Sequence, residues 1–339
     1  MEAKLGEFDL IWRFFKAGSE SMAQTQRDLV QLGIGDDCAL LEPDAAQSLA
    51  VTSDMLVEGR HFFAGANPEW LGHKALAVNL SDLAAMGAKP VGFTLALALP
   101  DANAAWLAQF SQGLFHLAQQ WQCPLIGGDT TQGPLTICIT AIGHVPAGSA
   151  IKRSGAKVGD DIWVSGTLGD ARLALGALRS EWPLDPISLE AVLPRMHEPE
   201  PRIALGMQLR GIASSALDVS DGLLGDLRHI LKASPVNAEV LIDQLPTSRT
   251  LAEQTQGLRR QCAANGGDDY ELCFTAPASK RMEVESLSTA LLPLTRIGSI
   301  SSASNGNEPI LILRDANGNL LNAAESMQLM QSFDHFMSK

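Results

Sequence analysis

Six short segments of the sequence place aspartate beside glycine, serine or threonine in apolar surroundings rather than on polar surface stretches. Four of the six come at the ends of predicted strands, where α/β domains bind their ligands. Carboxylates with neighbouring hydroxyls, here those of Thr52, Ser53 and Ser220, are hard oxygen ligands that suit Mg²⁺ or Mn²⁺. The sequence therefore predicts a divalent-metal site. The segments are residues 33–38, 51–54, 79–82, 126–129, 218–222 and 266–269.

Asp82 illustrates why these acids stand out. It shares one face of a predicted helix with Leu71, Ala75, Val78 and Ala85. An ionised carboxylate on a core-facing stripe is costly unless it is paired or binds a metal. For Asp82 alone, a salt bridge inside the fold or a different helix phase explains the pattern equally well. Six such segments are harder to explain in this way, because too few basic residues occupy similar contexts.

The overall charge of the chain disfavours a phosphorylated ligand unless cations are bound. The chain has 339 residues, with 38 Asp and Glu against 25 Lys and Arg, for a net charge of −13. This acidic balance speaks against binding to nucleic acid or to an anionic membrane. Phosphates would also be repelled unless cations lay between them and the protein, as Mg²⁺ ions held by the aspartates would.

Several protein classes are disfavoured by missing patterns. The longest apolar stretch is interrupted by charges and proline, and the N-terminus does not resemble a signal peptide. The five cysteines are odd in number and lack C-x-x-C spacing, which predicts buried thiols in the reducing cytoplasm. The P-loop, dinucleotide-binding and protein-kinase motifs are absent, as is the calcium-loop pattern near residues 218–226.

Helices and strands alternate along the chain, which predicts an α/β or α+β protein of two domains. The Gly, Pro, Ser and Lys-rich stretch 143–159 is the best boundary, giving domains 1–147 and 148–339. Helices are expected at residues 7–16, closed by Lys16 and Gly18, and at 67–87, 107–121 and 223–231. Strands are expected at 38–41, 49–52, 91–99, 125–126, 135–145, 161–165, 216–219, 240–242, 270–274 and 310–313.

Other residues have two readings. Arg153 lies in a basic stretch of the linker, which is either solvated or reaches phosphates where the domains meet. His61 follows the Asp54 segment and is either structural or part of the site. The glycine pairs 127–128 and 266–267 fit ordinary turns or close approach to a ligand. Residues 333–336 form a packed tail or an aromatic lid.

Taken together and in order, the motifs resemble the thiamine-monophosphate kinase family of bacteria, within the superfamily of aminoimidazole ribonucleotide synthetase. The resemblance spans nearly the whole chain. The matching motifs are residues 6–11, 33–39, 53–54 with 61–62, 74–87, 126–131, 153–157, 218–223, 266–272 and 333–336.

The resemblance implies a two-domain fold of the aminoimidazole ribonucleotide synthetase type, α/β (α+β). The N-terminal domain would bind metal and ATP and would pair across a homodimer into a barrel-like sheet. The C-terminal domain would be α+β. ATP would sit between the domains with several Mg²⁺ ions, and the second substrate would be thiamine monophosphate.

The resemblance also implies roles for individual residues. Asp54, Asp129 and Arg153 would be catalytic. Asp268 stands where many relatives carry Glu, and its shorter side chain departs from the family's pattern. Metal-binding positions are Asp37, Thr52, Ser53, Asp54, Asp82, Asp129, Asp218 and Asp221; ATP-contacting positions are Gly128, Asp129, Arg153 and Ser220; substrate positions are His61, Asp268 and Phe333.

The expected reaction is direct, in-line transfer of the ATP γ-phosphoryl group to thiamine monophosphate, giving thiamine diphosphate and ADP. The acceptor phosphate has a second pKa of about 6, so it needs no general base at neutral pH. Two alternatives remain. One is another ATP-dependent enzyme of the superfamily, although the first cysteine, Cys38, argues against a selenide enzyme. The other is a non-catalytic nucleotide- or metal-binding regulator, which the full set of acids disfavours.

Overall fold

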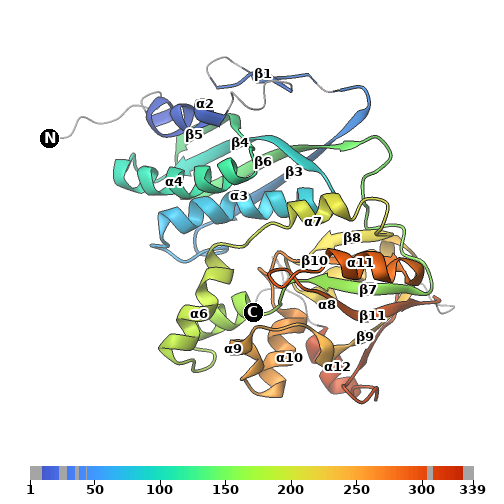
Figure 1. Ribbon diagram of the computed structural model, residues 1–339. Helices are drawn as coiled ribbons and strands as arrows, with labels where there is room; N and C mark the ends of the chain where they lie inside the picture. Colours follow the sequence, from blue (N-terminus) through green and yellow to red (C-terminus); the bar gives the residue numbers. More distant parts are fainter. Residues whose placement is uncertain (1–9, 23–28, 35–37, 43, 304–307, 331–339) are drawn as a thin grey trace. The chain divides into compact units, whose positions relative to one another are not determined.

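The computed structural model describes residues 10–22, 29–34, 38–42, 44–303 and 308–330. The chain divides into two compact units of mixed helix and strand (Figure 1). Unit 1 comprises Met1–Leu83 and Ala88–Ala150, and unit 2 comprises Ala84–Gly87 and Ile151–Lys339.

Unit 1 is built on a four-stranded sheet in the order β3-β6-β4-β5. β6 runs antiparallel to β3 and β4, whereas β4 and β5 are parallel and are joined by a crossover through α4. A short antiparallel ladder pairs β1 with β2. The bounds are η1 (Ile11–Lys16), α2 (Ala17–Met22), β1 (Val30–Leu32), β2 (Leu40–Leu41), β3 (Gln47–Val57), α3 (Pro68–Ala85), β4 (Lys89–Leu99), α4 (Ala104–Gln120), β5 (Leu125–Gln132) and β6 (Thr136–Pro146).

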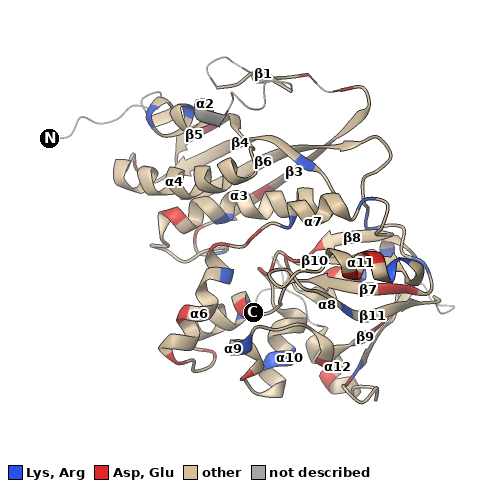
Figure 2. Cartoon of the chain, in the orientation of Figure 1, with Lys and Arg blue, Asp and Glu red and all other residues tan. Residues whose placement is uncertain are grey.

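Helices α3 and α4 cover one face of this sheet (Figure 1). The two helices pack closely at Gly72 and Gly113, where an added Cβ would lie 2.1 Å from Phe110 O and 1.8 Å from Glu69 O. On the covered face, alternate residues of β4 and β6 are buried, while those on the other face are partly exposed. The four strands β3 to β6 carry only three Asp, Glu, Lys or Arg residues, Asp54, Lys89 and Asp129 (Figure 2).

The N-terminal helix differs from its prediction. Residues 7–9 lie outside the described residues, and the helix continues as α2 through Gly18, where a stop was expected. Gly18 faces α4: an added Cβ there would lie 2.5 Å from the Phe115 ring, so the glycine allows close packing and does not end the helix. The π-helical turns of η1 also change the helix phase, which leaves Trp12 56% exposed.

Unit 2 contains a six-stranded sheet in the order β12-β9-β11-β7-β10-β8, antiparallel except for the β12–β9 pair. Helix α8 packs five apolar residues into the main core of this unit: Leu223, Leu224, Leu227, Ile230 and Leu231. The bounds are β7 (Asp160–Ser165), α5 (Asp170–Leu178), α6 (Pro186–His197), α7 (Ile203–Gln208), β8 (Ser215–Asp218), α8 (Leu223–Ala233), β9 (Asn237–Leu241), η2 (Ile242–Gln244), α9 (Arg249–Ala252), α10 (Gln256–Asn265), β10 (Leu272–Pro277), η3 (Ala278–Lys280), α11 (Arg281–Leu287), β11 (Leu294–Ser301), β12 (Leu311–Arg314) and α12 (Ala323–Leu329).

Two strand predictions in unit 2 needed correction. The strand expected at 270–274 begins only at Leu272, because Asp268 and Tyr270 have left-handed backbones with φ of 68° and 51°. Strand β11, between β9 and β7, was not predicted at all.

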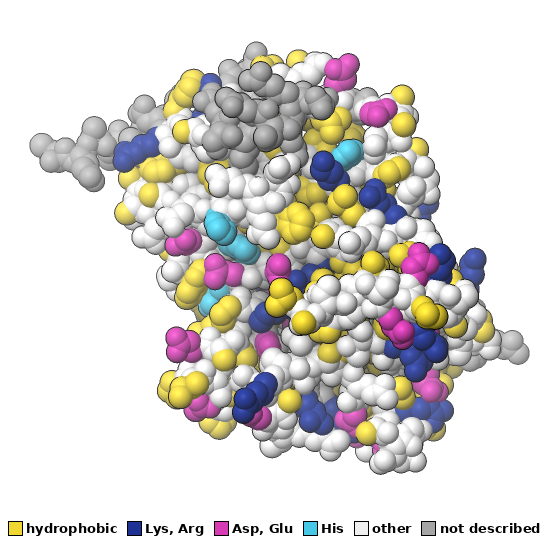
Figure 3. Space-filling view, viewed as in Figure 1, with side chains coloured by type: hydrophobic (Ala, Val, Ile, Leu, Met, Phe, Trp, Pro, Cys, Tyr) yellow, Lys and Arg dark blue, Asp and Glu magenta, His cyan; other side chains and the backbone are white. Residues whose placement is uncertain are grey.

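Figure 3 shows acidic and basic side chains interspersed on the visible surface. Within the described part of the chain, none of the helices combines the length and hydrophobicity needed to cross a bilayer.

Candidate active site

Strand β3 and helix α3 bring three of the predicted metal ligands to one place. Thr52 and Asp54 lie two residues apart on β3, so their side chains point to the face of the sheet that α3 covers. The Thr52 hydroxyl donates a hydrogen bond to Asp82 Oδ2 on α3. All three residues are half-buried. Asp82 is therefore not isolated in a core, and two carboxylates and a hydroxyl belong to one polar cluster.

Asn79 supports this cluster and was not assigned a role from the sequence. It is fully buried, one helical turn before Asp82. Its Oδ1 accepts a hydrogen bond from the backbone N–H of Asp54 at 3.1 Å, and its Nδ2 donates to Ala75 O at 3.1 Å. Asn79 thus fixes the backbone of Asp54 against α3. The spacing of three residues between Asn79 and Asp82, which puts both on one face of the helix, was the only sequence pattern that could have indicated this role.

Ser53 and Asp129 lie on the opposite face of the same sheet. The Ser53 hydroxyl lies 3.0 Å from Thr140 Oγ1 on that face. Asp129 on β5 pairs with Ala96, which pairs with Cys138, and paired residues point to the same face. β3 and β5 are separated by two strands, or about 14 Å at the usual strand spacing. One chain therefore does not bring Asp129 to the cluster formed by Thr52, Asp54 and Asp82.

Gly128 is explained by strand packing. Its φ is 151°, and an added Cβ would lie 2.0 Å from Leu95 O on β4. Only glycine allows β5 to lie this close to β4 next to Asp129.

His61 lies in the turn after β3 in a defined orientation. Its Nδ1 accepts a hydrogen bond from the backbone N–H of Val57 at 3.0 Å. An acceptor at Nδ1 means that the neutral ring carries its proton on Nε2. His61 therefore presents Nε2–H as a hydrogen-bond donor near the end of the strand that carries Asp54.

In unit 2, a single buried carboxylate shapes the loop that carries Ser220 and Asp221. Asp226 Oδ2 accepts hydrogen bonds from the backbone N–H groups of Ser220, Asp221 and Gly222 at 3.0, 3.1 and 3.1 Å. Burial, together with the charge of Asp221, raises the pKa of Asp226 to about 7. The sequence did not single out Asp226. Its position four residues after the Asp-Gly turn, in the first turn of α8, was the only signal.

This loop is joined to the segment 266–271 by backbone hydrogen bonds. Asp268 N donates to Ser220 O, and Tyr270 N donates to Val219 O, each at 2.8 Å. Val219 N donates in turn to Glu271 O at 2.8 Å. Gly267 allows this approach, because an added Cβ would lie 2.6 Å from Ser220 O. Asp218, Ser220, Asp221 and Asp268 are therefore held on two adjoining segments.

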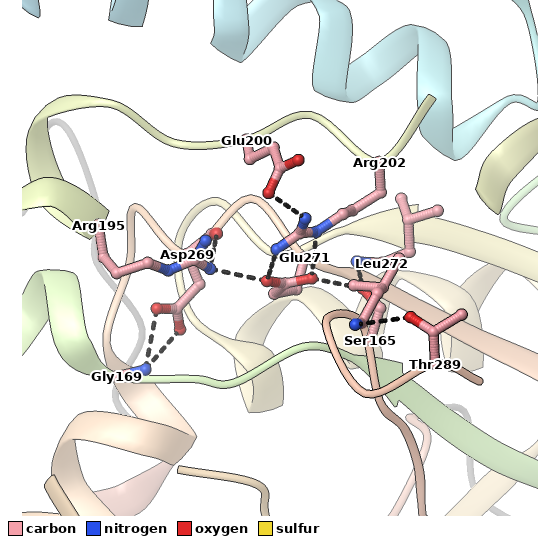
Figure 4. A network of polar contacts seen from close by, with 10 residues as sticks. Ser165, Gly169, Arg195, Glu200, Arg202, Asp269, Glu271, Leu272 and Thr289 are labelled. Atoms are coloured by element: carbon pink, nitrogen blue, oxygen red, sulfur yellow. Dashed lines mark hydrogen bonds and ion pairs between the residues drawn. The ribbon is translucent and has the colours of Figure 1, made fainter. Parts of the chain in front are cut away.

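Glu271 anchors the second segment from within the core (Figure 4). Its carboxylate is fully buried and accepts two hydrogen bonds from Arg202, at 2.8 and 2.6 Å. Arg195 donates a further hydrogen bond at 2.7 Å, and Ser165 one at 2.6 Å. Breaking a buried pair of this kind typically costs about 3–5 kcal/mol. No sequence signal linked Arg195 and Arg202 to Glu271.

Asp269, the residue between Asp268 and Tyr270, has a structural role. Both of its carboxylate oxygens accept from Gly169 N, at 2.8 and 3.0 Å, at the start of α5. Burial raises the pKa of this carboxyl well above its ordinary value. The side chain of Asp269 thus ties the segment 266–271 to the start of α5.

Arg153 is exposed, and its charge acts on the same region of unit 2. Burial lowers the pKa of His229 on α8, and the charge of Arg153 lowers it further, whereas that of Asp221 raises it. The backbone of Arg153 is fixed by a hydrogen bond from Ser234 Oγ to its carbonyl at 3.1 Å. The charges of Arg153 and Asp221 therefore both act on His229.

Two predicted residues, Asp37 and Phe333, lie outside the described residues. Among the residues that the structure does describe, no group of three or more His, Cys, Asp or Glu side chains is arranged to hold a metal ion by itself. The described acids instead form a cluster in unit 1 and a loop set in unit 2.

Comparison with known proteins identifies the family. The family described as "AIR synthase related protein, N-terminal domain" matches residues 35–145. Thiamine-monophosphate kinase of Escherichia coli K12 is 44% identical over 98% of each chain, and that of Salmonella typhimurium is 45% identical over 89% of this chain and 92% of its own. This chain belongs to the thiamine-monophosphate kinase family.

Solved structures of the family share the fold. The crystal structure of thiamine-monophosphate kinase from Stenotrophomonas maltophilia is 47% identical, covers 91% of this chain and 97% of its own, and has a TM-score of 0.81. A structure described as AaThiL complexed with AMPPCP and TMP is 30% identical, covers 94% and 95%, and has a TM-score of 0.70. The predicted membership of the family and the mixed α/β fold are thereby confirmed.

Proposed function

We propose that this chain transfers the γ-phosphoryl group of ATP to thiamine monophosphate and forms thiamine diphosphate and ADP, the last step of thiamine diphosphate biosynthesis. The observation that carries the proposal is its similarity to thiamine-monophosphate kinases over almost the whole chain. The family member complexed with AMPPCP and TMP supports both substrates. We place the reaction in the cytoplasm.

Mg²⁺ is the cofactor that these residues fit. Thr52, Asp54 and Asp82 supply hard oxygen donors in one cluster, and Asp218 and Asp221 supply more on their loop. When bound, Mg²⁺ ions neutralise the phosphates and align donor and acceptor for in-line transfer. We assign Asp37 and Ser53 to the metal ligands as well, with the Ser53 side chain on the face of β3 opposite to Thr52 and Asp54. Asp129 would ligate a different ion from Asp54 of the same chain, since the two lie at opposite sheet edges.

The remaining residues would bind the two substrates. Arg153 would contact the ATP phosphates together with Ser220, Gly128 and Asp129. His61 would donate from Nε2–H to the phosphate of thiamine monophosphate, and Asp268 and Phe333 would hold its ring system. Because the acceptor phosphate is largely deprotonated at neutral pH, none of these residues needs to act as a general base.

We further propose a homodimer in which the sheets of unit 1 from two copies form a barrel-like structure. The support is the edge strand β3, which exposes Leu49, Val51 and Met55 by 43%, 64% and 54% on the face that the helices leave uncovered. A row of exposed apolar residues on a sheet edge is typical of an interface.

One experiment tests the activity directly. The purified protein is incubated with ATP, Mg²⁺ and either thiamine or thiamine monophosphate, and the products are separated. We expect thiamine diphosphate in the reaction with thiamine monophosphate and no phosphorylated product in the reaction with thiamine. Absence of thiamine diphosphate, or a phosphorylated product from thiamine, would overturn the proposal.

A further inference from the structure

The segment that carries Asp268 has an unusual backbone. Asp268 and Tyr270 both adopt left-handed φ values, 68° and 51°, which side chains other than glycine rarely take. Such conformations persist only where the surroundings hold them, and they are frequent at functional sites. The two strained residues lie on either side of Asp269, and their side chains contact each other.

The contact between these two side chains is a hydrogen bond. The Tyr270 hydroxyl donates to Asp268 Oδ1 at 3.1 Å. Tyr270 is buried, with 8% of its surface exposed, whereas Asp268 is half-buried. A buried phenol that donates to one carboxylate oxygen restricts the rotation of the Asp268 side chain.

The backbone that carries Tyr270 is held through its two chain neighbours. Glu271 is locked by Arg202, Arg195 and Ser165, and Arg195 also donates to Asp269 O at 3.2 Å. The Asp269 side chain is fixed to Gly169. The backbone on both sides of Tyr270 is thus anchored in the core, because hydrogen bonds hold Asp269 and Glu271 (Figure 4).

We propose that Tyr270 is a positioning residue, which holds the Asp268 carboxylate in the orientation that receives the cationic, amine-bearing ring system of the acceptor substrate. This inference rests on the proposed function. Aspartate has one rotatable bond fewer than glutamate, and one hydrogen bond is enough to fix it. Tyr270 acts through Asp268 and contributes to recognition of the acceptor, with no part in binding ATP.

The first test is kinetic and uses Tyr270→Phe, which removes only the hydroxyl. We expect KM for thiamine monophosphate to rise about tenfold, the effect of losing one hydrogen bond to a charged group, with KM for ATP unchanged. In an Asp268→Asn background the same substitution should have almost no further effect. An equal rise in both KM values, additive effects, or no change at all would overturn the inference. Ser286→Ala removes an exposed hydroxyl elsewhere in unit 2 and serves as the matched control.

The second test does not depend on activity. The chain contains a single tyrosine, so protein labelled with ¹³C at the tyrosine Cζ gives one resonance, that of Tyr270. We expect this resonance to move in Asp268→Ala and, in the wild type, on addition of thiamine monophosphate but not of Mg²⁺ with a non-hydrolysable ATP analogue. An unchanged resonance in Asp268→Ala would overturn the positioning role, whether or not the protein is a kinase. A resonance that responds to Asp268→Ala but not to thiamine monophosphate would overturn the link to the substrate.

Discussion

The hydroxyl of Thr52 donates a hydrogen bond to Asp82, thirty residues further along the chain, and so joins strand β3 to helix α3 at the acidic cluster. Asp54 shares this face of β3, and Asn79 holds its backbone N–H from the same helix. The geometry of this cluster is therefore set by one strand and one helix within unit 1.

Removing the hydroxyl tests whether this pair matters for metal binding. We expect Thr52→Val to lower the rate of thiamine diphosphate formation at least about tenfold and to raise the Mg²⁺ concentration needed for half-maximal activity. Thr52→Ser keeps the hydroxyl and should stay close to the wild type. Magnesium titrations of the rate at saturating substrates measure both effects. Equal losses in the Val and Ser variants would show that side-chain packing, not the hydroxyl, is responsible.

Asp54 and Asp129 are expected to affect turnover far more than stability. Asp54→Asn and Asp129→Asn each keep the shape of the side chain but remove its charge, so each should lower kcat by about 100-fold or more while Tm changes little. Asp101→Asn, at an exposed position outside the site, is the control. If both variants retain wild-type turnover at saturating Mg²⁺, the metal assignment is wrong.

His61 is expected to act on the acceptor substrate. His61→Ala removes the Nε2–H donor and should raise KM for thiamine monophosphate more than KM for ATP. Steady-state kinetics with each substrate varied in turn measures the two values. A similar rise in both would assign His61 to the fold around Val57 and not to substrate binding.

The exposed apolar row on β3 predicts that association is sensitive to charge. Val51→Lys places a cation in the centre of this row and should convert the dimer to a monomer, as measured by sedimentation or light scattering. Ile187→Lys, at a residue that is 81% exposed in unit 2, provides the control. A wild-type protein that is already monomeric, or a Val51→Lys protein that stays dimeric, would contradict the proposed pairing.

The Asp243–Arg260 ion pair in unit 2 predicts a pH dependence of stability. The hydrogen bond from Arg260 lowers the pKa of Asp243 to about 2. A carboxyl whose pKa is lowered by folding stabilises the folded state above its unfolded pKa of about 4, and this contribution is lost as the pH falls towards 2. The free energy of unfolding of the wild type should exceed that of Asp243→Asn by about 1–2 kcal/mol more at pH 7 than at about pH 2. Chemical denaturation at the two pH values gives the comparison, and a difference that does not vary with pH would exclude the linkage.

The sequence predicted those elements in which regularly spaced apolar residues continue over many residues without interruption. Helix α3 was expected from Asn67-Pro68 to Gly87 and is observed at Pro68–Ala85. Gly18 misled the prediction, because a glycine that accommodates the Phe115 ring has the same local sequence as one that ends a helix. Strand β11 was missed because a register shift between Arg296 and Gly298 breaks the alternation of its apolar residues.

The candidate site could be predicted as a set of residues but not as an arrangement. Local context singled out Asp54, Asp82, Asp218 and Asp221. The alternation of side chains along β3 places Ser53 on the face opposite to Asp54. The register of β5, β4, β6 and β3 places Asp129 on that opposite face too, and register across four strands is a property of the whole unit. The supporting residue Asp226 and the pair Arg202–Glu271 were missed for the same reason: their partners are found only after folding.

Asp226 has one more consequence. Backbone N–H groups before a helix commonly cradle phosphate, but in this chain three of them, at Ser220, Asp221 and Gly222, already bond to the protein's own carboxylate. These N–H groups at the start of α8 are therefore not available to bind a phosphate. The acidic residues around them repel a nucleotide that carries no metal ion. On the proposed function, nucleotide affinity in this region would follow the concentration of free divalent cation, so that the chain would discriminate the metal–nucleotide complex from the uncomplexed nucleotide.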